Sequence, residues 1–267
     1  MTFFFITNIN YTTMNKSIIF FASLLLGSAA ASAQMTCVVA HRGYWDVEGS
    51  AQNSIRALVK ADSIDCYGSE FDVWMTADKK LVVNHDPDIN GIHIETSKAK
   101  DVLAQKLRNG ENVPTLEQYL DSSLTLKPRL ILELKPHADK KHEEDAIKAI
   151  VKMVKERGLE ANMEYITFSK PGFINLIKYA PKGTPILYLC GDLTPREIKA
   201  MGGTGIDYHY KVLKKNPWWI DECHALNLRV NAWTVNKEKD MLWCIEHGVD
   251  IITTNAPELL QQLLREK

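Results

Sequence analysis

Residues 67–86 read YGSEFDVWMTADKKLVVNHD, and this stretch decides how the chain can fold. Side chains alternate between the two faces of a strand, so Glu70 and Asp72 project from the same face of their strand. Residues 77–80 have the composition of a tight turn, and the apolar segment 81–83 returns after it. The stretch therefore predicts a hairpin that carries two carboxylates on one arm and brings His85 back on the other.

The two carboxylates of this hairpin need a counter-charge. Two ionised acids on one inward face repel each other, and burying them unpaired is expensive. We therefore expect a cation at the face that Glu70 and Asp72 share.

Strands and helices alternate along the rest of the chain. Buried strand patterns are predicted at residues 37–40, 130–132, 165–168, 186–189, 206–210, 229–234 and 250–253. Helical patterns follow at residues 53–62, 116–124, 145–157, 173–179, 195–201, 218–226, 237–247 and 257–265. Such alternation favours a parallel sheet.

Counting the strands distinguishes a closed sheet from an open one. The hairpin arm 81–83 follows its predecessor without a crossover, so it is no parallel neighbour. Without it, eight strand–helix units remain, the number that closes a TIM barrel. The sequence therefore predicts a TIM (β/α)8 barrel with a short hairpin and a loop insertion after the second strand. Residues 88–113 form that insertion, irregular and polar with helical character over 99–107, and an open doubly wound sheet is the alternative.

The first 33 residues predict export. Lys16 precedes an apolar run at 18–26 that is too short to span a bilayer comfortably, and the small-residue pattern Ala31-Ser32-Ala33 follows. We expect a signal peptide over 1–33 and a single barrel domain over 34–267, periplasmic or secreted from a bacterium, with no stable membrane insertion after cleavage. An uncleaved anchor is the alternative.

Composition excludes several classes of function. The formal net charge is −1 and no basic stripe is present, so nucleic acid is not implied as a partner. The five cysteines are odd in number and spread too widely for a disulfide framework, although one or two bridges stay open. No C-x-x-C motif or Cys/His cluster suggests zinc.

Polar residues end the first three predicted barrel strands, where the active site of such a barrel lies. They are His41 and Arg42, then Glu70 and Asp72, then Glu133 and Lys135. Because these strands are consecutive, their ends are expected to be adjacent. Three carboxylates at one mouth form a hard-oxygen site suited to one divalent cation, Mg²⁺ or Ca²⁺.

An ordered set of motifs over essentially the whole mature chain resembles the glycerophosphodiester phosphodiesterase family. The set is His41-Arg42-Gly43, Asn53-Ser54, Glu70-x-Asp72, Thr76-x-Asp78, His85-Asp86, Glu133-x-Lys135, Trp233-Thr234-Val235-Asn236 and Thr253-Thr254-Asn255. The resemblance implies a TIM barrel, one divalent cation, and hydrolysis of a small-molecule glycerophosphodiester to sn-glycerol 3-phosphate and an alcohol.

The resemblance also implies roles for particular residues. On the family pattern, Glu70, Asp72 and Glu133 hold the metal, and His41 and His85 are the acid–base pair in an order left open. Physical chemistry supports this set, since two histidines can exchange protons near neutral pH. Arg42 and Lys135 are placed to add positive charge at the phosphate, and Trp233 to give an apolar wall for the glycerol carbons.

One position departs from the family pattern. Gln52-Asn53-Ser54 stands where the family usually has Glu-Asn-Thr, so one negative charge near the cation is missing. Two other functions stay open: a lipid phosphodiesterase of the same fold that forms a cyclic phosphate, and a barrel that binds a phosphorylated ligand without catalysis. The head group is also open, because the insertion is where this family varies its substrate contacts. The sequence does not give the oligomeric state either.

Overall fold

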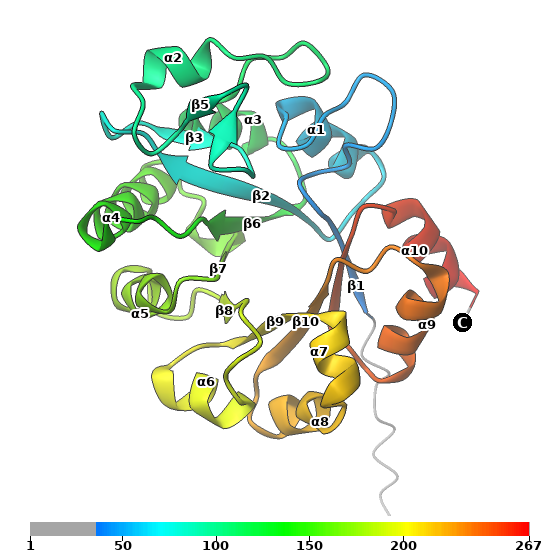
Figure 1. Cartoon of the computed structure of the whole chain (residues 1–267). Helices are drawn as coiled ribbons and strands as arrows, with labels where there is room; N and C mark the ends of the chain where they lie inside the picture. Colours follow the sequence, from blue (N-terminus) through cyan, green and yellow to red (C-terminus); the bar gives the residue numbers. More distant parts are fainter. Residues whose placement is uncertain (1–35, 267) are drawn as a thin grey trace, which may run out of the picture. The chain divides into compact units, whose positions relative to one another are not determined.

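The computed structural model describes residues 36–266 (Figure 1). The predicted signal peptide therefore lies outside the described residues, and the boundary after residue 33 stays a prediction.

Eight parallel strands close into a barrel, which confirms the predicted TIM fold. They are β1 (Cys37–Ala40), β2 (Gly68–Met75), β6 (Arg129–Leu134), β7 (Met163–Thr167), β8 (Ile186–Tyr188), β9 (Gly205–His209), β10 (Arg229–Trp233) and β11 (Ile251–Thr254). Each strand pairs in parallel with its neighbours, and β1 pairs with both β11 and β2. This last pairing excludes the open sheet.

Helices surround the barrel strands (Figure 1). They are α1 (Ile55–Ser63), α3 (Leu116–Ser123), α4 (Lys140–Glu156), α5 (Lys170–Tyr179), α6 (Pro195–Met201), α8 (Trp218–Ala225), α9 (Glu238–Glu246) and α10 (Pro257–Arg265). Side-chain caps fix several helix starts. Thr115 and Thr194 each form a capping box with the Gln or Glu three residues later, which satisfies backbone N–H groups that have no partner inside the helix.

Two short helical segments fall outside the predicted pattern. A 3₁₀ turn, η1 (Glu160–Asn162), precedes β7, and α7 (Tyr210–Lys215) follows β9. The sequence prediction placed Tyr210 at the end of a strand, but the strand ends at His209, whose ring accepts a hydrogen bond from the Lys211 backbone N–H at 3.2 Å. This cap begins a helix at Tyr210, the residue that the sequence analysis expected to end the strand.

The predicted hairpin and insertion lie after β2. Strand β3 (Leu81–Val83) runs antiparallel to β2, as expected. The insertion contains a two-stranded ribbon, β4 (Asp88–Ile89) and β5 (Ile92–His93), which the sequence reading missed. The predicted helical character is real but shorter, since α2 spans Ala99–Leu103. The insertion has its own small core, formed by Trp74, Val82, Ile94, Val102 and Val113.

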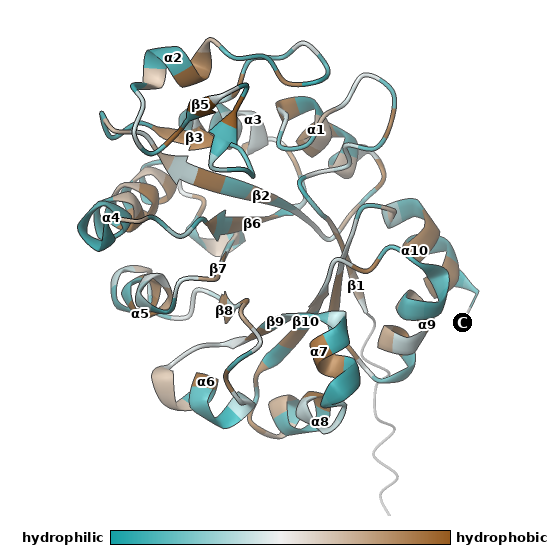
Figure 2. Cartoon of the chain, viewed as in Figure 1, coloured by the Kyte–Doolittle hydropathy of each residue, from teal (hydrophilic) through white to brown (hydrophobic). Residues whose placement is uncertain are grey.

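The alternation of β2 separates apolar from acidic side chains. Phe71 and Val73 are fully buried in the main core, while Glu70 and Asp72 project to the other face. Apolar residues follow the barrel strands and the helix faces that cover them (Figure 2). A second, smaller cluster contains Val39, Ile131, Ile166, Leu187, Leu189 and Ile251. The barrel is therefore a packed body, and the acids of β2 project away from its main core.

Over residues 36–266, no helix combines the length and the apolar character needed to cross a bilayer. Cys66, Cys190, Cys223 and Cys244 are free thiols, so none of them takes up the bridges that the sequence left open.

Candidate active site

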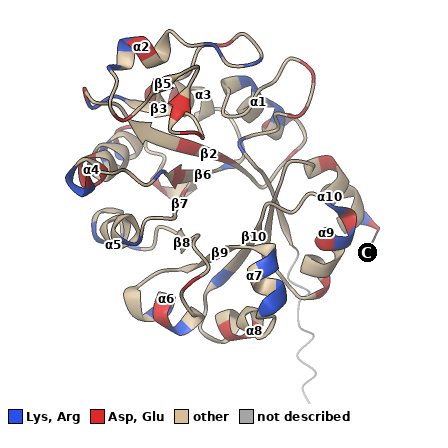
Figure 3. Ribbon diagram, viewed as in Figure 1, with Lys and Arg blue, Asp and Glu red and all other residues tan. Residues whose placement is uncertain are grey.

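The predicted polar residues do come together at the carboxyl ends of β1, β2 and β6. The register pairs Asp72 on β2 directly with Glu133 on β6. Acidic residues on these two neighbouring strands stand out in the charge view (Figure 3). Parallel strands present their carboxyl ends on one edge, so residues from distant parts of the sequence converge there. They are His41, Arg42, Glu70, Asp72, Glu133 and Lys135.

Glu70, Asp72 and Glu133 form one buried cluster. Each offers a carboxylate oxygen, and these oxygens lie within 4.8 Å of one another. Their exposed fractions are 2%, 1% and 7%. The sequence prediction that three carboxylates meet at one mouth therefore holds as geometry.

Lys135 and Arg42 partly balance these acids. The Lys135 ammonium lies 3.2 Å from Asp72 Oδ1 and 2.7 Å from Glu133 Oε1. Arg42 Nε lies 3.8 Å from Asp72 Oδ2, and the Arg42 backbone N–H donates to Glu70 Oε2 at 2.8 Å. Three acids against two cations leave excess negative charge, so ion pairing alone does not account for the cluster.

The pKa values of the three acids diverge because their surroundings differ. Burial, together with the charges of Asp72 and Glu133, raises the pKa of Glu70 well above its usual range. Burial and the charge of Asp72 raise the pKa of Glu133 to about 7. Burial also opposes ionisation of Asp72, but the charge of Lys135 outweighs it with help from other neighbours, and the pKa of Asp72 falls below its ordinary value.

The cluster fits a divalent cation. Glu70 Oε1 is buried and has no hydrogen-bond partner. A buried acceptor without a partner is costly, and a hard cation would satisfy it. All three donor groups are carboxylates, the ligands that Mg²⁺ and Ca²⁺ prefer. Glu70, Asp72 and Glu133 are thus suited to the ion that the sequence analysis expected.

The surroundings of His41 fix which ring nitrogen carries its proton. Asn255 Oδ1 lies 2.7 Å from His41 Nδ1 and 3.2 Å from the indole Nε1 of Trp45. An indole N–H can only donate, so the shared atom must be the amide oxygen. That oxygen requires a donor at His41 as well, so the neutral ring holds its proton on Nδ1. Its Nε2 lies 4.0 Å from Glu70 Oε2 and carries the lone pair.

His85 has a different partner. Its Nδ1 lies 2.7 Å from Asp86 Oδ1, a carboxylate that favours the protonated ring. Burial and the charge of Arg42 lower the pKa of His41 to about 4, and burial lowers the pKa of His85 although Asp72 acts against this. Burial therefore acts against the imidazolium form of both rings, and at His85 the hydrogen bond to Asp86 acts in its favour.

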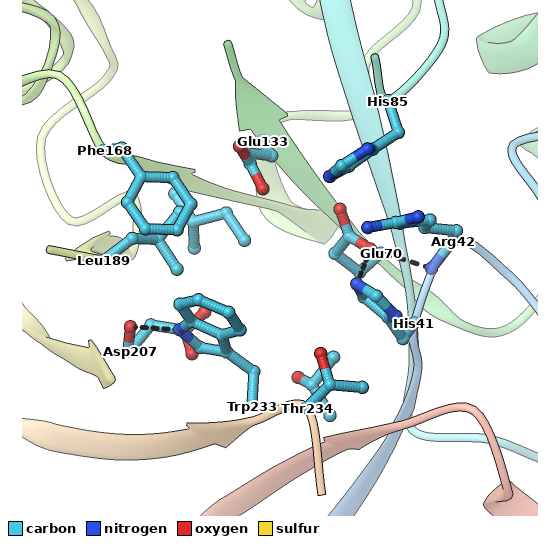
Figure 4. A pocket seen from close by; sticks show the side chains of 12 residues that line it. His41, Arg42, Glu70, His85, Glu133, Phe168, Leu189, Asp207, Trp233 and Thr234 are labelled. Atoms are coloured by element: carbon cyan, nitrogen blue, oxygen red, sulfur yellow. Dashed lines mark hydrogen bonds and ion pairs between the residues drawn. The ribbon is translucent and has the colours of Figure 1, made fainter. Parts of the chain in front are cut away.

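Both histidines line one cavity of about 210 Å³, together with Arg42, Glu70 and Glu133. The facing wall is apolar, and Figure 4 shows Phe168, Leu189 and Trp233 across the pocket from His41 and Glu70. Trp233 therefore lines the pocket as predicted. Arg42 also reaches the pocket, whereas the Lys135 ammonium contacts Asp72 and Glu133, so its contact with a phosphate stays a prediction.

Sequence reasoning gave no role to several residues of this site. Asn53 was noted only as part of a motif, yet its Nδ2 donates to Asp72 Oδ2 at 2.8 Å and its Oδ1 accepts from the Asp72 backbone N–H at 3.1 Å. It has a φ of 60°, a conformation that asparagine tolerates better than most residues. Gln52, the departure from the family pattern, accepts a hydrogen bond from Arg42 Nη1 at 2.6 Å.

Asp207 was not anticipated either. It follows an apolar residue in β9, is 1% exposed, and lines the same cavity. The only signal in the sequence was an acid inside a predicted buried strand.

Comparisons with known proteins agree with this geometry. The model of the family described as "Glycerophosphoryl diester phosphodiesterase family" matches residues 40–259. A glycerophosphodiester phosphodiesterase from Parabacteroides distasonis, known from a crystal structure, is 47% identical, with a TM-score of 0.86 over 87% of this chain and 98% of that one. A glycerophosphodiester phosphodiesterase from Caldanaerobacter subterraneus is 26% identical over 250 residues, which cover 86% of this chain and 98% of the relative.

A more distant structure shares the fold. It is an Oleispira antarctica phosphodiesterase in complex with the product sn-glycerol-3-phosphate, 19% identical, with a TM-score of 0.75 over 87% of this chain and 98% of that one. With the family model matched over most of the described residues, the chain belongs to the glycerophosphoryl diester phosphodiesterase family and is a phosphoric diester hydrolase.

Proposed function

We propose that the chain is a metal-dependent hydrolase that converts glycerophosphodiesters to sn-glycerol 3-phosphate and an alcohol, with His41 and His85 as its acid–base pair. The observation that carries this proposal is the meeting of three buried carboxylates with two histidines at one pocket. Membership of the family supports the substrate class, as does the product in the distant Oleispira antarctica structure.

The side chains divide the work along the pocket. When bound by Glu70, Asp72 and Glu133, a divalent cation would withdraw charge from the phosphate and favour attack at phosphorus. Arg42 supplies a fixed positive charge at the same wall, where the transition state gains negative charge. Trp233 and Phe168 offer the opposite wall to the carbon skeleton of the glycerol.

The hydrogen-bond partners favour one order for the two histidines. His41 is held by the neutral amide of Asn255 and presents an unprotonated Nε2, so it is the group suited to take a proton from water. His85 is held by the Asp86 carboxylate, whose charge opposes the effect of burial and favours the imidazolium form, so it is the better placed of the two to give a proton to the leaving alcohol. We therefore assign the base to His41 and the acid to His85.

The place of action is proposed from the sequence alone. Lys16, the apolar run 18–26 and the Ala31-Ser32-Ala33 pattern support export and cleavage after Ala33. A periplasmic or secreted enzyme would meet glycerophosphodiesters released from deacylated phospholipids.

The test uses the mature chain from Gln34 to Lys267. It is incubated with a panel of glycerophosphodiesters, with chelator and then with Mg²⁺ or Ca²⁺ restored, and release of glycerol 3-phosphate is measured. We expect release that stops with chelator and returns with metal. Phosphorus NMR of the products separates this from the lipid-type reaction, since a cyclic phosphate would replace the hydrolytic product. Binding of glycerol 3-phosphate without any turnover of the diesters would favour the binding protein instead.

A further inference from the structure

Asp207 is a buried acid on the side of the pocket away from the proposed metal ligands. The barrel order runs β2, β6, β7, β8, β9 in one direction and β2, β1, β11, β10, β9 in the other, so β9 lies four strands from β2 either way. In an eight-stranded ring that is the opposite side. Asp207 therefore faces the pocket from across the barrel, next to the Trp233 wall (Figure 4).

One oxygen of Asp207 has no partner within the described part of the chain. Its side chain is 1% exposed, and Oδ1 is buried without a hydrogen bond. Other pocket-lining residues with such atoms are Arg42 and Glu70, which belong to the charged cluster. Asp207 lies outside that cluster, opposite Asn231 of β10 in the register and beside the Trp233 wall, and a buried acceptor without a partner is costly there.

The polar groups around Asp207 are already engaged. The Trp233 indole N–H donates to the Asp207 backbone oxygen at 2.8 Å, so it is not available to a ligand. Asn231 and Thr253 hydrogen bond to each other, with Asn231 Nδ2 to Thr253 Oγ1 at 3.0 Å and Thr253 Oγ1 to Asn231 Oδ1 at 3.2 Å. The free oxygen of Asp207 is therefore a polar contact that this wall can offer to a bound molecule.

We infer that Asp207 binds a hydroxyl group of the substrate's glycerol moiety and so selects phosphate esters of polyols over esters of simple alcohols. With the phosphate at Arg42 and the metal ligands, the rest of the ligand extends toward β9. Its C–H groups pack on Trp233, and a hydroxyl donates to Asp207 Oδ1. This inference rests on the proposed function of the site.

The test compares two ligands that differ only in the hydroxyl groups. sn-Glycerol 3-phosphate and propyl phosphate share the three-carbon ester, and calorimetry with Ca²⁺ present gives the dissociation constant of each. We expect the wild-type chain to bind glycerol 3-phosphate about tenfold more tightly, the size of one buried hydrogen bond. In Asp207→Leu the preference should fall to about twofold or less, and Asp207→Asn, which keeps an acceptor, should retain most of it.

Each outcome decides the inference. The inference would be overturned if the wild type bound the two ligands equally well, or if Asp207→Leu kept the wild-type preference for glycerol 3-phosphate. It would also be overturned if Asp207→Leu lost affinity for both ligands by the same factor. If Asp207→Leu does not fold, Asp207→Ala serves in the same comparison. Because binding is measured without turnover, a wild-type chain that hydrolyses no diester but shows an Asp207-dependent preference would refute the proposed function and leave this inference standing.

Discussion

Asn255 shows how a single neutral side chain can set the chemistry of a histidine. Its amide oxygen accepts from both Trp45 and His41 and so leaves His41 Nε2 unprotonated toward the pocket. Replacing it by leucine removes the acceptor with little change in volume, and both ring tautomers of His41 become available.

We expect Asn255→Leu to lower kcat by about tenfold or more while KM changes little, because a general base contributes only in the correct protonation state. Asn255→Asp, which keeps the acceptor, should retain more activity. Steady-state kinetics measures both, and nitrogen-15 NMR of the His41 ring reports the tautomer directly. Equal activities in the two variants with an unchanged tautomer would show that Asn255 has no such role.

The raised pKa values of Glu70 and Glu133 predict how metal binding depends on pH. A cation binds the ionised acids. Protons therefore compete with it at a pH below the raised pKa values of Glu70 and Glu133, and the pKa of Glu133 is about 7. We expect the affinity for Ca²⁺ to increase between about pH 6 and pH 8, with protons released on binding. Calorimetry at several pH values measures this. The increase should persist in His85→Asn, and an affinity that falls over this range would contradict the account.

At the residue scale, sequence supplied the positions of the charged groups but not their partners. Glu70, Asp72 and Glu133 could be grouped because strand periodicity and barrel topology place them on one edge. The bonds of Asn53 and Asn255 could not be foreseen, because each depends on a rotamer and on a residue far away in the sequence. Asp207 was missed for the same reason, since nothing local shows whether a buried acid in a strand has a partner.

At the scale of elements, the hairpin and insertion after β2 form a small body with its own core. The Trp74 indole N–H in that core donates to the His85 backbone oxygen at 3.2 Å. The packing of this insertion therefore supports the position of a proposed catalytic residue.

Ile94 tests that core, because its side chain is fully buried within it. We expect Ile94→Ala to lower the free energy of unfolding by about 2–5 kcal/mol, through lost burial and the cavity left behind. Ile174→Ala is the matched control, since Ile174 is 51% exposed and should change stability by about 0.5 kcal/mol or less. Urea denaturation measures both. Similar losses in the two variants would show that the insertion contributes no core of its own.

The elements of the barrel were predictable, and those of the insertion only in part. Apolar strands and amphipathic helices gave all eight barrel strands, because burial on both faces leaves a strong signal. The ribbon β4–β5 has two residues in each strand, too few for any periodicity to appear. The short helix α7 depends on the His209 cap, which pattern reading does not see.

At the scale of the whole molecule, the order of the chain brings the first and last strands together. β1 pairs with β11 over four residue pairs, from Cys37 with Ile251 to Ala40 with Thr254. His41, next after β1, then meets Asn255, next after β11. The active site is therefore complete only in a closed barrel, which brings His41 and Asn255 together although 214 positions separate them in the sequence.

Export is the whole-chain prediction that lies outside the described residues. When the full chain is expressed in a bacterium, we expect the protein in the periplasmic or secreted fraction with Gln34 as its first residue, because the small-residue pattern ends at Ala33. N-terminal sequencing of the fractionated protein measures this. Ala33→Leu should slow cleavage, and a protein that stays in the membrane with an intact N-terminus would instead support the uncleaved anchor.

The central claim is that Glu70, Asp72 and Glu133 hold a metal on which hydrolysis depends. Glu70→Gln tests it most directly, since it removes one ligand charge while the shape of the side chain is kept. The measurement is glycerol 3-phosphate release from a glycerophosphodiester by wild type and variant, after chelation and after Mg²⁺ or Ca²⁺ is restored. The account predicts metal-restored release by the wild type and a loss of about a hundredfold or more in a variant that still folds. Release by the variant at the wild-type rate, or release by the wild type that chelator does not affect, would contradict it.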